Sequence, residues 1–197
     1  MYEYITGRLV ELNPADSIIE CGGFGYRILI SLNTYSKLQN DGEEFVKLYL
    51  HHHLKEDEEA FYGFYDKDER SLFTLLISIS GVGPNTARMM LSSMTSDELT
   101  AAIIGQDVNK IKSVKGIGLK TAQRVILELK DKVGKTQSAD IQTLSGGTSS
   151  AAREEALGAL VMLGFAKPAA EKAISMILKD NPQISLEELI KKALKIL

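Results

Sequence analysis

A chain of 197 residues, 44% apolar and 25% charged, has the length and composition of a folded soluble protein of one to a few domains, which excludes a disordered or fibrous chain. Its longest apolar runs are far below the roughly 20 residues that cross a bilayer and its N-terminus is not basic, so we expect a cytoplasmic protein with no membrane span or export signal. The single cysteine, Cys21, excludes an internal disulfide, and the formal net charge of −3 argues, for the chain as a whole, against nucleic-acid binding.

The first 64 residues alternate between apolar and polar positions with the two-residue period of β-strands. Tyr26, Ile28 and Ile30, for example, fall on one face of an extended segment. This part of the chain carries 5 basic and 11 acidic residues, a net charge of −6. Its short strands predict a five-stranded barrel of the oligonucleotide-binding (OB) type. The expected strands span about 2–12, 16–21, 24–31, 44–54 and 59–64, with a tight Gly22-Gly23 turn and a short helix at about 33–39.

The pattern changes to a helical period at Asp66, and helices are expected almost to residue 133. Leu72, Phe73, Leu75, Leu76 and Ile79 form one apolar helix face, and Thr95-x-x-Glu98 is a capping box that begins a later helix. Residues 65–136 contain 11 basic and 8 acidic residues, and the stretch 108–135 alone carries a net charge of +6. The charge that suits phosphate groups is therefore concentrated in the middle of the chain, which the total of −3 conceals.

The last part of the chain starts with small and polar residues that show no sustained periodicity, which predicts a flexible linker. Three short amphipathic helices follow at about 151–163, 168–180 and 185–197, the last opened by Ser185-x-x-Glu188. The predicted fold is a multi-domain α+β chain. Its domains are an OB-type barrel at 1–64, an all-α domain at 65–136, a linker at 137–150 and a UBA-like three-helix domain at 151–197.

The middle region contains an internal repeat in which the frame Gly-apolar-Gly-x-x-Thr-Ala occurs twice, 35 residues apart. Two glycines allow a tight turn and a close approach of the backbone to a ligand, while the apolar residue between them can enter the core. The helix that follows presents free N–H groups and the positive end of its dipole, which together suit a DNA phosphate and carry no sequence preference. The candidate DNA-binding residues are Gly81, Val82, Gly83, Pro84, Asn85, Thr86, Lys115, Gly116, Ile117, Gly118, Leu119, Lys120, Thr121 and Arg124.

A single Gly-x-Gly between helices is more often only a helix cap and a tight turn. Two copies with matching Thr-Ala ends, the second inside the strongly basic stretch, are hard to explain by capping alone. The repeat therefore favours phosphate binding.

These motifs identify a resemblance to the RuvA family of bacterial proteins, which bind four-way (Holliday) DNA junctions and work with the RuvB motor ATPase. The resemblance extends over the full chain. It is carried by Thr6-Gly7-Arg8-Leu9, Gly22-Gly23-x-Gly25-Tyr26, Tyr62-Gly63-Phe64, both Gly-x-Gly turns, Glu128-x-Lys130-Asp131 and Ala159-Leu160-x-x-Leu163-Gly164. It implies a central domain of two helix-hairpin-helix motifs between the barrel and the tethered three-helix domain.

The resemblance also implies a function in branch migration during recombination, DNA repair and the SOS response. Four subunits, or eight in two facing tetramers, would hold an open planar junction, and the C-terminal domain would dock on the RuvB hexamer, with Leu160, Leu163, Gly164 and Phe165 as candidate contacts. The RuvC resolvase is a further implied partner. No cofactor, metal or catalytic residue is expected in this chain, because the motor uses the ATP.

An acidic run lies between the last two expected strands, where a hairpin tip belongs. In the family an acidic pair there forms a pin at the tetramer centre, and Glu56 and Asp57 match it by position. Carboxylates near the crossover phosphates would repel them and keep the junction from re-stacking. Glu58 and Glu59 depart from the family pattern, and they either deepen the repulsion or point along the strand.

Two departures in the repeats remove basic groups. Asn85 stands where the family often has a basic residue, and Leu119 precedes Lys120 where two lysines are common. Each departure removes a phosphate partner, so we expect a weaker salt dependence of binding than in a more basic relative.

Other motifs support different functions less well. His51-His52-His53 would alternate between the two faces of a strand and has no acid or cysteine spaced to complete a metal site. Gly134-Lys135-Thr136 resembles the end of a P-loop, but Leu129 occupies the position of the first glycine.

Two other functions remain open as alternatives. A DNA glycosylase is a rival because the second repeat is similar to the lysine-bearing hairpin of that superfamily, with Lys120 as the nucleophile. The acids that could assist it, Asp131 and Asp140, lie late on a basic helix and in the expected linker, and the cysteines of an iron–sulfur cluster are absent. A generic DNA-binding adaptor without junction preference is the third possibility.

Overall fold

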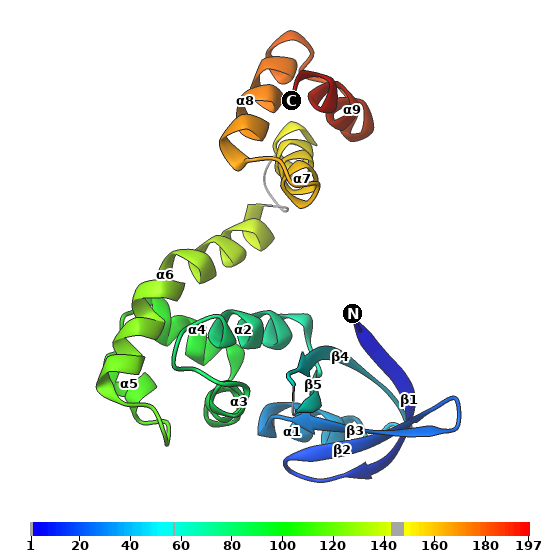
Figure 1. Ribbon diagram of the computed structural model, residues 1–197, viewed down its shortest axis with the longest axis vertical. Coiled ribbons are helices and arrows are strands. Elements are labelled where there is room, and N and C mark those ends of the chain that lie inside the picture. Colours follow the sequence, from blue (N-terminus) through cyan, green and yellow to red (C-terminus); the bar gives the residue numbers. More distant parts are fainter. Residues whose placement is uncertain (1, 57, 143–147) are drawn as a thin grey trace. The chain divides into compact units, whose positions relative to one another are not determined.

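The computed structural model describes residues 2–56, 58–142 and 148–197 (Figure 1). The chain divides into two compact units, Met1–Lys135 and Thr136–Leu197, and each is described by itself. Within the described ranges, no helix has the length and apolar character that a membrane crossing requires.

The N-terminal part is the expected barrel. Its strands close in the order β1-β2-β3-β5-β4, with β3 and β5 parallel and the other pairs antiparallel. Ile19, Ile28 and Leu48 are fully buried inside it, as the alternation predicts. Gly22 and Gly23 both have positive φ angles, 60° and 83°, which explains the glycines in this turn. The elements are β1 (Tyr4–Leu12), β2 (Asp16–Cys21), β3 (Phe24–Ile30), α1 (Leu32–Asp41), β4 (Phe45–Leu54) and β5 (Glu59–Phe64).

Helices follow directly and share a core with the barrel. Phe73 is fully buried, and its ring centroid lies 5.1 Å from that of Tyr62 and 4.8 Å from that of Phe64, both on β5. The predicted capping box is confirmed: the Thr95 hydroxyl accepts from the Glu98 amide, and the Glu98 carboxylate accepts from the Thr95 amide. Barrel and helices therefore form one unit. The helices are α2 (Lys67–Ile77), α3 (Pro84–Ser93), α4 (Ser96–Ile104), α5 (Val108–Lys112) and α6 (Leu119–Gln142).

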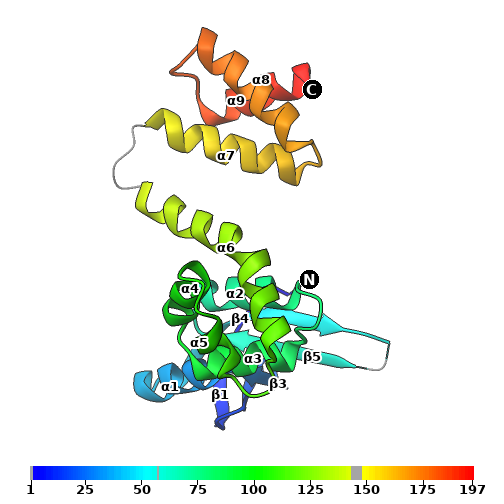
Figure 2. The ribbon, with the colours of Figure 1, turned by 90° about the vertical axis from the view of Figure 1, so that its left-hand side faces the viewer.

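The second unit contains the three predicted helices, α7 (Thr148–Met162), α8 (Lys167–Asp180) and α9 (Leu186–Ile196), which surround a small core (Figure 2). Leu160, Ile174 and Leu189 are fully buried in it. The Ser185 hydroxyl accepts from the Glu188 amide at the start of α9, as predicted.

The structure corrects the expected extent of the segment 137–150. α6 continues to Gln142 and α7 already begins at Thr148. A glycine inside a helix costs about 1 kcal/mol relative to alanine, which does not stop a helix that is already propagating, and no proline follows Gly134 before residue 142. Residues 143–147 lie outside the described part of the chain, and the domain boundaries stay predictions.

A buried carboxyl group joins the barrel to α2. Glu69 is 2% exposed and accepts hydrogen bonds from the hydroxyls of Ser31 and of Thr34, the latter at 2.7 Å. Burial raises the pKa of the Glu69 carboxyl, although these two hydrogen bonds act in the opposite direction.

This pKa shift predicts a pH dependence of stability. A group whose pKa is higher in the folded state stabilises the fold below its unfolded pKa, and that stabilisation is lost as pH rises through the folded pKa. The Gln side chain of Glu69→Gln cannot ionise. The free energy of unfolding of this variant should therefore rise relative to that of the wild type between pH 4 and pH 7. Urea unfolding of both proteins at the two pH values measures this. An equal difference in the free energy of unfolding between variant and wild type at both pH values would show that folding does not raise the pKa of Glu69.

Candidate nucleic-acid interface

The first Gly-x-Gly turn connects α2 to α3. Gly81 has a φ of 93°, and the Val82 amide donates to the carbonyl oxygen of Ile79 at 3.0 Å, so the turn closes on itself. The Val82 side chain is 4% exposed and packs in the core, as predicted. α3 begins after Gly83 with Pro84 in its first turn, and no side chain caps it. The Val82 amide is already used and Pro84 has no N–H, so the amides available to an external acceptor are those of Asn85 and Thr86 at the start of α3.

The second turn, between α5 and α6, repeats this geometry. Gly116 has a φ of 89°, the Ile117 amide donates to Val114 at 3.1 Å, and the Ile117 side chain is 5% exposed. The amide of Ala122 donates to the Gly118 oxygen at 2.9 Å, as that of Ala87 does to Gly83. The sequence repeat is thus a repeat of backbone structure.

The outer surface of both turns is open. A Cβ atom added at Gly83 or Gly118 would have no protein atom within 4 Å, and neither glycine has a positive φ. Their backbone can therefore be approached closely by a ligand. Most of the predicted contact residues are exposed, with Pro84, Thr86 and Thr121 half-buried and only Val82 and Ile117 in the core.

Arg124 has a structural partner that the sequence did not reveal. Its Nε donates to Glu128 Oε1 at 2.8 Å, and its Nη1 lies 3.4 Å from the carbonyl oxygen of Ser80, beside the first turn. The side chain thus links the helix of the second hairpin to the loop of the first. The spacing of four residues between Arg124 and Glu128 was a signal for the first contact.

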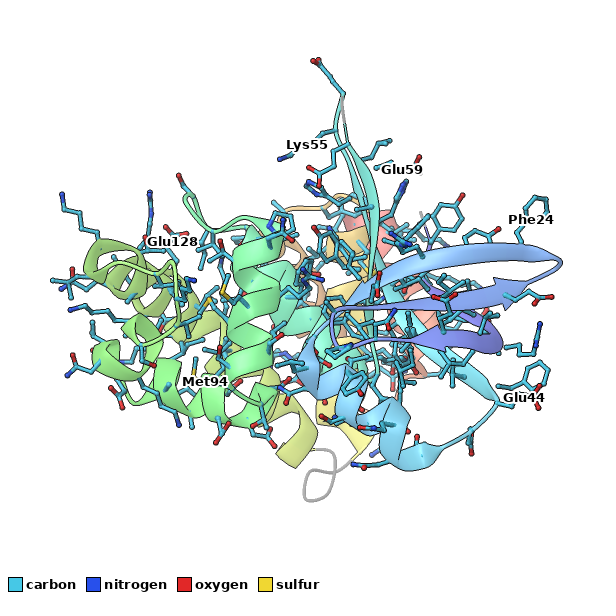
Figure 3. The ribbon with its side chains drawn as sticks, turned by 90° about the horizontal axis from the view of Figure 1, so that it is seen from below. Phe24, Glu44, Lys55, Glu59, Met94 and Glu128 are labelled. Atoms are coloured by element: carbon cyan, nitrogen blue, oxygen red, sulfur yellow. The ribbon has the colours of Figure 1, made fainter. Side chains whose placement is uncertain are left out.

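The β4–β5 hairpin stands out from the barrel, and Lys55 and Glu59, the first and last residues of the acidic run, lie on either side of its turn (Figure 3). Lys55 N donates to the carbonyl oxygen of Glu58 at 2.8 Å and closes the turn. Glu56 and Glu58 are exposed, and Asp57, the other predicted pin residue, lies outside the described residues. Glu59 Oε1 lies 2.9 Å from His52 Nε2, so this extra acid points back along the strand.

The histidines alternate as predicted. His52 stacks on Phe61 with ring centroids 4.8 Å apart, whereas His51 and His53 lie on the other face, 6.4 Å from each other. Burial and the neighbouring histidines lower the pKa of His51. In the described parts of the chain, no three His, Cys, Asp or Glu side chains gather as metal ligands would.

Comparison with known proteins gives the family. The family profile described as RuvA N terminal domain matches residues 1–63, and a protein of Bacteroides fragilis strain YCH46, named Holliday junction branch migration complex subunit RuvA, is 50% identical over 99% of both chains. The chain belongs to the RuvA family. The profile of the RuvA C-terminal domain matches residues 151–197, and that of a SAM-like helix-hairpin-helix tandem matches 73–131. Relatives of the same name from Christiangramia forsetii (50% identical, 99% of both chains) and Parabacteroides distasonis (49%, 100% of both) are similar throughout.

The C-terminal unit corrects one residue of the surface expected from the RuvA resemblance. Leu160 is completely buried, so it cannot contact a partner directly, and Phe165 packs partly against the same core. Leu163 is 60% exposed, and the neighbouring Met162, which the sequence analysis missed, is 90% exposed. Three consecutive apolar residues follow Leu160, and they cannot all lie on one helix face. This was the sequence signal that Met162 could be exposed.

One departure from the RuvA pattern predicts a change in salt dependence. Asn85 is exposed in the first turn of α3, where a lysine could reach the phosphate that the hairpin amides would hold. Asn85→Lys should steepen the slope of log K against log potassium chloride concentration by about 0.9 for each new phosphate contact.

Gln39→Lys is a suitable control. Gln39 is exposed on the barrel helix α1, so this substitution adds the same charge away from the hairpin. Fluorescence anisotropy titrations over a series of salt concentrations measure both slopes. Equal slopes for Asn85→Lys and the wild type would remove residue 85 from the contact surface.

Proposed function

We propose that this chain is the subunit that binds four-way DNA junctions in a branch migration complex, holding the junction open and planar during recombination and repair. The observation that carries this proposal is the pair of matched Gly-x-Gly hairpins, each of which places the start of a helix on an open surface, with no side-chain cap at the start of α3. The relatives named as Holliday junction branch migration complex subunits, similar over the whole length, support it.

The hairpins would hold phosphates through backbone amides, and Lys115 and Lys120, both exposed, would add ionic contacts. Such contacts follow the DNA backbone and read no bases. Recognition of the junction then depends on where the hairpins lie. In a tetramer, four subunits would direct eight hairpins to the four arms.

The chain would contribute no chemistry of its own. ATP would be hydrolysed by a RuvB hexamer, which the C-terminal unit would recruit, and RuvC would resolve the junction that this assembly holds. The glycosylase alternative has less support, because the named relatives match over the full length, barrel included.

Competition between DNA shapes tests the proposal. A labelled four-way junction is bound to the protein and displaced with unlabelled junction or with linear duplex of equal length. We expect unlabelled junction to displace the labelled junction at a concentration at least roughly tenfold lower than linear duplex does. This factor corresponds to a preference for junction shape of about 1.4 kcal/mol. Equal competition would favour a generic DNA-binding adaptor. A borohydride-trapped adduct at Lys120 on damaged duplex would instead favour the glycosylase.

The acidic tip of the β4–β5 hairpin predicts tighter binding when it is neutralised. Two unit charges about 4 Å apart repel by about 1 kcal/mol in water, so Glu56→Gln with Asp57→Asn should raise junction affinity roughly fivefold or more. The pair Glu43→Gln and Glu44→Gln removes the same charge from another part of the barrel, and Glu44 lies far from Lys55 and Glu59 in Figure 3. Weaker binding by the neutral tip would contradict repulsion as its role.

A further inference from the structure

The barrel helix α1 is hydrogen-bonded to the helix of the first hairpin. The side-chain amide of Asn33 donates to the carbonyl oxygens of Leu91, at 2.5 Å, and Met94, at 2.9 Å. These two oxygens lie at the C-terminal end of α3, where helix carbonyls lack partners within the helix. A side chain from the barrel therefore caps the helix that presents the first hairpin.

Two further bonds connect the same parts. The Leu32 amide donates to Ser92 Oγ at 3.1 Å, and the Arg88 guanidinium donates to the carbonyl oxygen of Ala15 at 2.7 Å. Ala15 lies between β1 and β2, so α3 is tied to the barrel at two separate places. These contacts are polar and directional, and they restrict sliding and rotation more than apolar packing does.

The other side of α1 is fixed to α2. Besides donating to Glu69, the Thr34 hydroxyl accepts from the Tyr65 amide at 3.0 Å. Residue 65 directly follows β5, one of the two strands that carry the acidic tip. A chain of hydrogen bonds therefore runs from the base of the acidic hairpin through α1 to the end of α3.

We infer that Asn33 is a positioning residue: through α1 and α3 it fixes the first Gly-x-Gly hairpin relative to the acidic β4–β5 hairpin, and thereby sets the preference for four-way junctions over linear duplex. This inference rests on the proposed function. A duplex needs only the hairpin amides, which Asn33 does not contact. A junction needs the phosphate sites and the acidic β4–β5 hairpin at a fixed spacing. The phosphate sites would engage an arm of the junction, and the acidic hairpin would face the crossover.

Affinity for two DNA shapes tests the role. Asn33→Ala, alone and with Ser92→Ala, should lower junction affinity about tenfold, since two or three hydrogen bonds across the joint are lost, and should leave duplex affinity within about twofold. Ser93→Ala is the matched control, because the Ser93 hydroxyl donates within α3, to the Met89 carbonyl oxygen at 2.9 Å, and makes no hydrogen bond to the described residues of the barrel. An equal loss for both DNAs, or no loss, would overturn the positioning role.

A distance measurement without DNA separates this inference from the proposed function. Spin labels at Lys55→Cys and Met89→Cys, in a Cys21→Ser background and diluted with unlabelled chain, report the spacing of the acidic hairpin and α3 by pulsed electron resonance. The distance distribution should broaden in Asn33→Ala and stay unchanged in Ser93→Ala. An unchanged distribution in Asn33→Ala would refute the inference even if the wild type prefers junctions. Broadening in a protein whose wild type binds junction and duplex equally would show that Asn33 positions the hairpin, and the failure would then lie in the proposed function.

Discussion

Gly118→Val is expected to abolish junction binding and to leave the fold intact. Gly118 has no positive φ, and a Cβ atom there has open space around it, so the protein itself tolerates a side chain. The valine would fill the space that a phosphate needs beside the first amides of α6. A hydrogen bond to a charged group contributes about 1.5–3 kcal/mol, so the loss of two reduces affinity by roughly 100-fold or more.

The control for this change is another open glycine. Gly158, on α7, also has no positive φ and no atom within 4 Å of an added Cβ, so Gly158→Val makes the same substitution in the unit that carries no hairpin. Anisotropy titration with a labelled junction measures both affinities, and thermal unfolding checks both folds. Normal affinity in a folded Gly118→Val protein would remove the second hairpin from the phosphate contacts.

Leu163→Glu is expected to eliminate recruitment of the ATP-driven motor without affecting DNA binding. Leu163 is 60% exposed beside the exposed Met162 at the end of α7, an apolar surface suited to a protein partner. A carboxylate placed in such a contact would lose its hydration without gaining a counter-ion, which costs several kcal/mol and reduces binding at least 100-fold. Stimulation of the partner's ATPase on junction DNA measures the effect.

Met176→Glu is the matched control. Met176 is 50% exposed and lies on α8 of the same unit. The substitution therefore adds the same charge at a similar exposure on another helix. We expect it to keep motor stimulation. Equal losses in the two variants would show that charge anywhere on the unit is harmful, and normal stimulation by Leu163→Glu would move the docking surface elsewhere.

Local patterns predicted much of this structure. Strand alternation identified the barrel, and the Gly-apolar-Gly frame predicted both turns, including the burial of Val82 and Ile117, because such features depend on neighbours in sequence. The end of α6 was missed because helix propagation through Gly134 is decided by small energies that composition does not resolve.

Contacts between distant residues could not be predicted. Asn33 and Met94, or Arg124 and Ser80, meet only because the elements between them have folded, and neither sequence spacing nor residue type indicates the pairing. The burial of Leu160 likewise depends on how three helices share a small core. Sequence therefore identified the hairpins but not what holds them in place.

The mass of the protein in complex with a four-way junction tests the central claim most directly, because recognition of junction shape requires several copies of the hairpin pair around one crossover. Light scattering of the purified complex should give four chains of 21.6 kDa for each junction, or eight if two tetramers face each other. One or two chains for each junction would contradict fourfold recognition, and with it the proposed geometry of hairpins and acidic tips.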